Sequence, residues 1–211
     1  MFNTLYTNNI IYLVRHGETD WNRFPKKFQG RKNLPLNTIG IYQAYCLAKY
    51  FKKINIAYIF TSPLKRAYKT AEIINRFHSL SIFQCEELIE MNFGDWEGKT
   101  TEEIKQNYPH IWQLWQTHPE KVKIPKAETL EELIGRCYLA LEKIKKYSGG
   151  PKLVITHGAF LRAMIIGLSD KPKSSFNKII QDNGAINIIH FKNFPKLLLI
   201  NYTGHLNNRS I

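Results

Sequence analysis

The sequence predicts an α/β fold with a mainly parallel central sheet. Short apolar runs, typical of buried strands, alternate along the chain with stretches of helical periodicity. The chain has 211 residues, 44% of them hydrophobic, which is enough for one substantial core. Polar or charged residues directly follow three of the apolar runs, as is typical where strands end at a ligand site. We therefore expect a single domain over residues 1–211.

The expected strands begin near the N-terminus. Residues 10–15 are apolar until the final arginine, as in a strand buried on both faces. Residues 57–61 and 152–156 form similar short runs. Residues 185–191 and 196–202 are expected to close the sheet as a hairpin-like pair.

Three helices carry recognisable start signals. Asn37 is expected to cap a helix that runs to about residue 53. Ser62 is the expected N-cap of a second helix, with Pro63 at its first position. Thr129 and Glu132 form a capping box for a third, which runs to about residue 146. A further helix is expected directly after the strand at 152–156.

The segment 91–128 is expected to form a cap or insert. Residues 99–118 are rich in tryptophan and tyrosine and predict short helices outside the main sheet. Trp112 and Trp115 are expected to pack one of these helices onto the cap rather than to stack on a substrate.

The composition narrows the partners and the compartment. The net charge is +13, but the lysines are scattered, so an anionic small-molecule substrate is favoured over specific nucleic-acid binding. No apolar run approaches the ~20 residues that span a bilayer, and we expect a cytoplasmic protein with no membrane association. Cys46, Cys85 and Cys137 are widely spaced and suit reduced, buried thiols.

Three strand ends carry the residues of chemical interest. Arg15-His16, Thr61-Ser62 and Thr156-His157 each follow an apolar run. In open α/β sheets such ends share one edge, where helix N-termini favour anions. We therefore expect one anion pocket built from three segments.

Phosphoryl transfer without a metal is the chemistry that these residue types favour. It needs fixed positive charge, a nucleophile and a proton donor for the leaving group. Arg15, Arg66, His16 and His157 meet the first two needs. For the acid, residue types alone leave several carboxylates open, namely Glu18, Glu87, Glu90, Asp95 and Glu97.

The run from Leu13 to Asn22 resembles the signature of the histidine phosphatase superfamily, the phosphoglycerate-mutase-like group. Further motifs follow in the family's order and cover nearly the whole chain: Gln29-Gly30-Arg31, Pro35-Leu36, Ser62 to Ala67, Glu90 to Gly98, Thr156 to Ala159, and Asn183 to Ala185. The resemblance implies a three-layer α/β/α sandwich with a small helical cap, and neither metal nor organic cofactor. Homodimers are common in such a family.

The resemblance also implies residue roles. His16 would be the nucleophile that becomes phosphohistidine, and Glu90 the acid that protonates the leaving group and then activates water. The phosphoryl oxygens would be bound by Arg15, Asn22, Arg66, His157 and backbone N–H groups at Gly158 and Ala159. Further candidates for substrate contacts are Thr19, Gln29, Gly30 and Met91.

Within the family, the pattern favours a phosphatase similar to alpha-ribazole and broad-specificity phosphatases. Phosphoglycerate mutases usually carry an arginine after the acid and a long basic insertion, whereas Met91 follows Glu90 here and the next segment is compact. The basic loop 23–28, Asn33 and Ala127 depart from the usual pattern. The alternatives are a 2,3-bisphosphoglycerate-dependent mutase and a catalytically silent phosphate- or polyanion-binding module. The silent module is disfavoured because His16 and Glu90 are both present.

Overall fold

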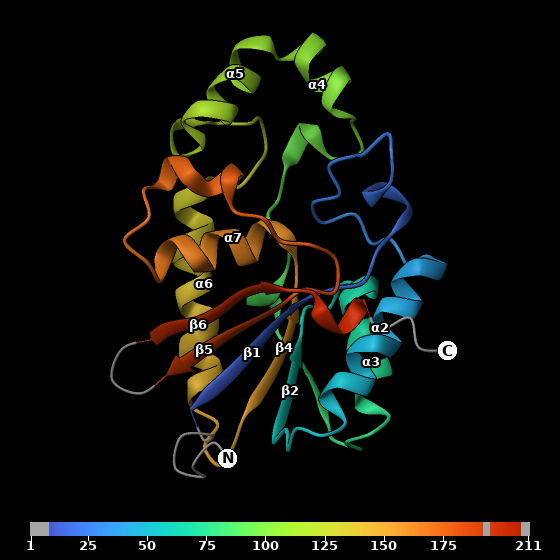
Figure 1. Cartoon of the computed structure of the whole chain (residues 1–211). Helices are drawn as coiled ribbons and strands as arrows, with labels where there is room; N and C mark the ends of the chain where they lie inside the picture. Colours follow the sequence, from blue (N-terminus) through green and yellow to red (C-terminus); the bar gives the residue numbers. More distant parts are fainter. Residues whose placement is uncertain (1–8, 192–194, 208–211) are drawn as a thin grey trace.

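The computed structural model describes residues 9–191 and 195–207 and contains one six-stranded sheet (Figure 1). Its strand order is β3-β2-β4-β1-β5-β6. The first four of these strands run parallel, while β5 is antiparallel to both β1 and β6. The strands are β1 (Ile10–Arg15), β2 (Tyr58–Thr61), β3 (Ile82–Gln84), β4 (Lys152–Thr156), β5 (Ile186–Phe191) and β6 (Pro195–Tyr202). The expected mainly parallel sheet is confirmed, and β3 is an addition that the sequence did not predict.

Helices cover both faces of the sheet, which confirms the three-layer α/β/α fold (Figure 1). α2 (Thr38–Phe51) and α3 (Lys65–Asn75) lie on one face. α6 (Leu130–Lys145) and α7 (Gly158–Gly167) lie on the other. In β1, Leu13 belongs to the core beneath α6 and α7, whereas Val14 belongs to the core beneath α2 and α3. Burial on both faces explains the continuous apolar runs of these strands.

The short helices α4 (Thr101–Asn107) and α5 (Pro109–Thr117) lie apart from the sheet, as expected for 99–118 (Figure 1). Trp115 is buried, and its ring lies 5.7 Å from that of Trp96 and 5.6 Å from that of Phe176. Phe176 lies in a 3-10 segment after α7, so this aromatic cluster ties the outlying helices to the body of the molecule.

The expected helix starts are confirmed at two sites and wrong at a third. Asn37 caps α2 by accepting a hydrogen bond from the Gly40 N–H at 2.8 Å, and the Thr129 capping box opens α6. Ser62 does not cap α3, which begins at Lys65 after Leu64. The Ser62 N–H instead donates to the Ile155 carbonyl at 3.0 Å, which continues the β2–β4 ladder and turns the side chain toward the edge of the sheet.

The loop after β1 lies against the first turn of α2. A Cβ added to Gly40 would lie 2.0 Å from the Glu18 carbonyl oxygen, and one added to Gly17 would lie 2.4 Å from the Gly40 carbonyl oxygen. Both neighbours are backbone atoms, so a side chain at either position forces the two segments apart.

Gly40→Ala should therefore destabilise the fold by about 1–3 kcal/mol, as overpacking does. Gly135→Ala is the matched control, because Gly135 lies within α6 with nothing inside 4 Å of an added Cβ. That control should raise the free energy of unfolding by about 0.5–1 kcal/mol through helix propensity. Denaturant titration of both variants measures the difference, and equal effects would contradict the close approach.

Candidate active site

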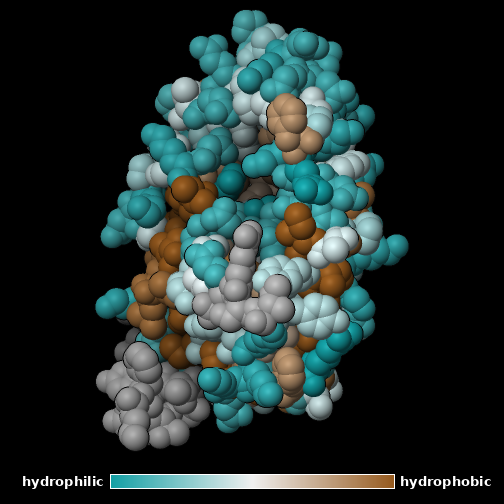
Figure 2. Space-filling model, turned by 45° about the vertical axis from the view of Figure 1, so that its right-hand side comes forward, coloured by the Kyte–Doolittle hydropathy of each residue, from teal (hydrophilic) through white to brown (hydrophobic). Residues whose placement is uncertain are grey.

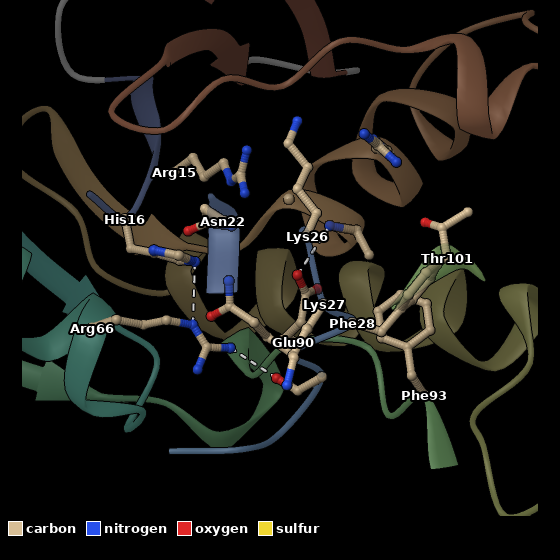
Figure 3. A pocket seen from close by; sticks show the side chains of 15 residues that line it. Arg15, His16, Asn22, Lys26, Lys27, Phe28, Arg66, Glu90, Phe93 and Thr101 are labelled. Carbon is tan, nitrogen blue, oxygen red and sulfur yellow. Dashed lines mark hydrogen bonds between the residues drawn. The ribbon is translucent and has the colours of Figure 1, made fainter. Parts of the chain in front are cut away.

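A pocket of about 270 Å³ lies at the carboxyl ends of the central strands, under the cap. The face in Figure 2 is hollowed below the cap, and mostly hydrophilic side chains surround the hollow. Most of the residues singled out in the sequence line this pocket (Figure 3): Arg15, His16, Asn22, Gln29, Gly30, Arg66, Glu90, Gly158 and Ala159. Arg15 pairs with Thr156 across β1 and β4, and Thr61 with Ile155 across β2 and β4, so the three strand ends are level.

The His16 imidazole is held in one tautomer. Its Nδ1 lies 2.6 Å from the Gly17 carbonyl oxygen and donates to it. Its Nε2 therefore carries the lone pair, and it accepts a hydrogen bond from Arg66 Nε at 3.2 Å. Burial, followed by the charges of Arg66 and Arg15, lowers the His16 pKa well below its usual value. The ring is thus neutral at neutral pH, with its basic nitrogen at the pocket.

Two guanidinium groups, the buried one of Arg66 and the half-buried one of Arg15, flank this imidazole. Arg66 is fully buried on α3 and also donates to the carbonyls of Lys32 and Gly30 at 2.6 and 2.8 Å. Arg15 donates through one terminal nitrogen to the Gln181 carbonyl at 2.5 Å. Its buried Nε has no hydrogen-bond partner among the described residues. Burial lowers the pKa of each arginine to about 10, so both remain charged at neutral pH.

His157 lies behind the pocket surface and is fully buried. Its ring centroid lies 5.1 Å from that of His16, and its Nε2 is hydrogen-bonded to Ser62 Oγ at 2.7 Å. Burial, then the charge of Arg66, lowers its pKa well below the usual value. The role of Ser62 was missed in the sequence, where the residue looked like a helix cap.

Glu90 is the carboxylate that lines the pocket. Its Oε1 accepts from the N–H groups of Met91 and Phe160 at 2.8 and 3.0 Å, and its Oε2 accepts from the Ala159 N–H at 3.2 Å. The carboxylate thus sits on the first turn of α7, where backbone N–H groups favour negative charge. The Ala159 N–H, expected to bind a phosphoryl oxygen, binds Glu90 in this structure.

The other candidate carboxylates have different partners. Glu18 accepts from Asn37, and Glu97 accepts from the Arg31 N–H. Asp95 pairs with Lys126. Glu87 pairs with Lys143, a hydrogen bond that, together with one from Cys85, lowers the pKa of Glu87 to about 2.

The Asn22 side chain is fixed through its amide oxygen, and its amide NH₂ is the free end. Its Oδ1 accepts from the N–H and hydroxyl of Thr19 at 3.0 and 3.1 Å and from Asn183 Nδ2 at 3.2 Å. Thr19 is fully buried and does not line the pocket, and neither does Met91, which packs in the core. Thr19 affects the site through its hydrogen bonds to Asn22. Met91 affects it through its backbone N–H, which donates to Glu90.

Arg136 on α6 holds the Glu90 segment from behind and was also missed in the sequence. Its guanidinium makes two hydrogen bonds to the Glu128 carboxylate, at 2.8 and 2.7 Å. It also donates to the carbonyls of Glu87, Ile89 and Glu90 at 2.9, 2.5 and 3.3 Å. An arginine eight positions after a turn glutamate matches no recognisable sequence motif, so only the fold reveals this contact.

Burial raises the pKa of Cys85 to about 11 and that of Cys137 well above its usual value. Across residues 9–191 and 195–207, no three His, Cys, Asp or Glu side chains are grouped so that they could hold a metal ion. In the same ranges, no helix has the length and apolar character needed to span a membrane.

Residues 11–202 match the model of the histidine phosphatase superfamily, branch 1. This chain belongs to that superfamily. A Bacillus subtilis protein described as uncharacterized phosphatase PhoE is 40% identical over 161 residues, which are 75% of this chain and 77% of that protein. Phosphoserine phosphatase 1 of Hydrogenobacter thermophilus is 31% identical over 93% of each chain. The solved structure of Bacillus stearothermophilus YhfR superposes with a TM-score of 0.88 at 30% identity, over 93% of this chain and 98% of that one.

The two buried imidazoles make stability dependent on pH. In the unfolded chain both have pKa values near 6.5, and in the folded chain both values are lower. Below pH 6.5 the unfolded state therefore binds more protons, so the free energy of unfolding falls as the pH decreases. Each imidazole should contribute about 1.4 kcal/mol per pH unit until it protonates in the folded state. Unfolding of His16→Asn in phosphate-free buffers should show a shallower slope, and exposed His118→Asn an unchanged one. An identical slope in wild type and His16→Asn would contradict the burial effect.

Removal of Arg136 should destabilise the fold. Arg136→Met removes the paired hydrogen bonds to the half-buried Glu128 carboxylate and those to three carbonyls, at a cost of about 3 kcal/mol. Arg76→Met on the exposed end of α3 should stay within about 0.5 kcal/mol of wild type. Denaturant titration compares the two, and a loss no larger than that of the control would contradict the role of the clamp.

Proposed function

We propose that this chain hydrolyses small phosphomonoesters through a phosphohistidine on His16, with Glu90 as the general acid and base. The observation that carries the proposal is the tautomer of His16. Its protonated Nδ1 is held by a carbonyl, and its basic Nε2 is held in a pocket that Arg15 and Arg66 make positive. A neutral nucleophile beside fixed cations is what phosphoryl transfer requires. The phosphatase names of the relatives support the same reaction class.

In the first step, His16 Nε2 attacks phosphorus while the bond to the leaving oxygen breaks. Glu90 donates a proton to that oxygen as it leaves. The open Nε of Arg15, the amide of Asn22 and the Arg66 guanidinium bind the phosphoryl oxygens, and His157 supports the His16 ring from behind. In the second step, Glu90 takes a proton from water as the water oxygen attacks phosphorus. The phosphorus–nitrogen bond breaks, inorganic phosphate is released, and His16 is regenerated in its neutral form.

The first turn of α7 has a role in both steps. Because the Ala159 and Phe160 N–H groups bind Glu90, we propose that they act mainly on the acid. They stabilise the carboxylate that remains after the leaving group has taken the proton. Gly158 lies closest to Arg15 and leaves room for its side chain, since an added Cβ would lie 3.2 Å from Arg15 Nε.

The segment 91–128 is proposed as the cap of a single domain, with Phe93 and Thr101 on the pocket wall. A homodimer and a cytoplasmic location remain predictions from the sequence. A mutase would have to retain a bisphosphorylated intermediate, and Met91, at the position where mutases usually carry an arginine, is buried in the core. Incubation of 3-phosphoglycerate with 2,3-bisphosphoglycerate should therefore release phosphate rather than form 2-phosphoglycerate.

His16→Ala should abolish turnover of p-nitrophenyl phosphate and the trapping of labelled phosphate on the protein. The exposed His118→Ala should keep both, and wild-type activity should persist in EDTA. Labelled phosphoenzyme in the His16 variant would contradict the nucleophile assignment. Loss of wild-type activity in EDTA would contradict a metal-free reaction.

Glu90→Gln should separate substrates by their leaving groups. An alkyl ester such as glycerol 3-phosphate needs the acid and should lose about 10²–10⁴-fold in kcat. p-Nitrophenyl phosphate has a stable leaving anion and should lose far less. Steady-state kinetics on both esters provides the comparison, and equal losses would assign the acid role to another group.

A further inference from the structure

We propose that Arg162, supported by Lys26 and Lys27, forms a second anion site in the same pocket, so that the preferred substrate carries an anionic leaving group. This inference rests on the proposed phosphatase function and specifies its substrate class. The leaving group would bear a carboxylate or a second phosphate, and Arg162 would bind it beside the reacting phosphoryl group.

The pocket holds more positive charge than one phosphoryl group needs. Its lining contains five cationic side chains and one carboxylate, Glu90. Arg15 and Arg66 flank His16 and match the phosphoryl oxygens. The surplus cations are the two lysines of the loop 23–28 and Arg162 of α7. Arg66 is fully buried and Arg15 and Arg162 are half-buried, and like charges gathered away from water are unfavourable unless a ligand supplies the opposite charge.

Arg162 is held in place but has an unused donor. Its guanidinium lies over the ring of Phe176, 6.0 Å from the centroid, and this contact orients the side chain. Its buried Nε has no hydrogen-bond partner within the described ranges, and no carboxylate there forms an ion pair with it. A half-buried guanidinium that lines a pocket with an open donor suits a planar anion, which it can bind through two parallel hydrogen bonds.

The position of Arg162 indicates that the anion it binds belongs to the leaving group of the substrate. Arg162 is on the same helix as Ala159 and Phe160, whose N–H groups hold the Glu90 carboxylate. Glu90 in turn acts on the leaving oxygen. Consistent with this proximity, the charge of Glu90 raises the Arg162 pKa against the larger lowering by burial, and Arg162 lowers that of Arg15. An anion bound by Arg162 therefore lies on the far side of the scissile bond from His16.

The lysines extend this positive side toward solvent. In Figure 3, Lys26 reaches over the pocket on the side of Arg15, away from Phe28 and Phe93. Lys26 and Lys27 are exposed, and the Lys27 amine lies 5.6 Å from the centre of the Trp21 ring. Exposed cations at a pocket mouth attract anionic substrates more than they fix them. Arg162 is thus the specificity residue of the set.

The test uses esters that differ only in the second anion. 3-Phosphoglycerate and glycerol 3-phosphate share a three-carbon chain and differ by a carboxylate against a hydroxymethyl group. Wild type should prefer 3-phosphoglycerate in kcat/KM by about 10- to 100-fold, as for a charged hydrogen bond. A second comparison, of fructose 1,6-bisphosphate with fructose 6-phosphate, tests a second phosphate as the anion. The pair with the larger preference identifies which anion the site binds.

Arg162→Met keeps the apolar stem over Phe176 and removes the charge. It should raise KM for the anionic member of the preferred pair by about 10- to 100-fold and leave the neutral member and p-nitrophenyl phosphate within about threefold. Arg162→Lys should restore part of the preference, and surface Arg76→Met should change nothing. Denaturant titration shows that the variants fold.

Two results would overturn the second site. One is the absence of any preference for the anionic ester in wild type, with p-nitrophenyl phosphate still hydrolysed. The other is an equal loss on both members of a pair in Arg162→Met, which would make Arg162 a positioning residue. Both leave the phosphatase function intact, whereas failure to hydrolyse any ester would refute that function itself.

Discussion

The hydrogen bond from Arg66 to His16 connects the cationic side chains of the site with the imidazole. The other contacts of the site depend on it. A guanidinium next to an imidazole opposes protonation of that imidazole, so the nitrogen that accepts this bond keeps its lone pair. The bond depends on the order of the sheet, in which β2, followed by α3 with Arg66, is separated from β1 by β4 alone. The carbonyls of Gly30 and Lys32 hold the other guanidinium nitrogens and fix the geometry. In the proposed reaction, the phosphoryl oxygens would replace the imidazole as acceptor and free Nε2 for attack.

Glu90, the proposed acid, is supported in a different manner from His16, the proposed nucleophile. Glu90 lies in an irregular segment, not at a strand end, and it is held from two sides. The first turn of α7 binds its carboxylate, while Arg136 on α6 binds the carbonyls before it. Two helices of the same layer thus place a loop residue within reach of a strand-end histidine. An irregular backbone needs this support, because no ladder of sheet hydrogen bonds positions it.

The sequence was sufficient for the parts of the molecule that follow local rules. Apolar runs revealed the strands of the sheet except β3, whose three residues are too few and too exposed to show a pattern. Side-chain chemistry revealed the caps at Asn37 and Thr129. The ordered motifs indicated most of the pocket residues. Ser62 was misinterpreted because its position in the β2–β4 ladder, not its helix-capping preference, decides where its hydroxyl lies.

The residues that sequence reasoning missed act across long separations in the chain. Arg136 contacts carbonyls more than forty positions earlier, and Arg162 lines a pocket that the distant loop 23–28 also lines. Neither has a periodic or motif signal. Thr19 and Met91 illustrate the reverse case, in which a residue inside a motif is buried and contributes through a neighbour.

The placement of the pocket walls has a consequence for how such a protein diversifies. The part of the pocket around His16 is built mainly from β1, β4 and α3, whose buried side chains tolerate little change. The opposite end stands on the loop 23–28, on the 3-10 turn region near Phe93 and on the start of α4, which are attached at the rim of the sheet. Insertions and substitutions in these rim segments can remodel the ester that is accepted while the nucleophile keeps its geometry. The molecule is thereby divided into a pocket floor carried by the buried sheet and a recognition wall carried by surface segments, so that the wall can change without rebuilding the sheet.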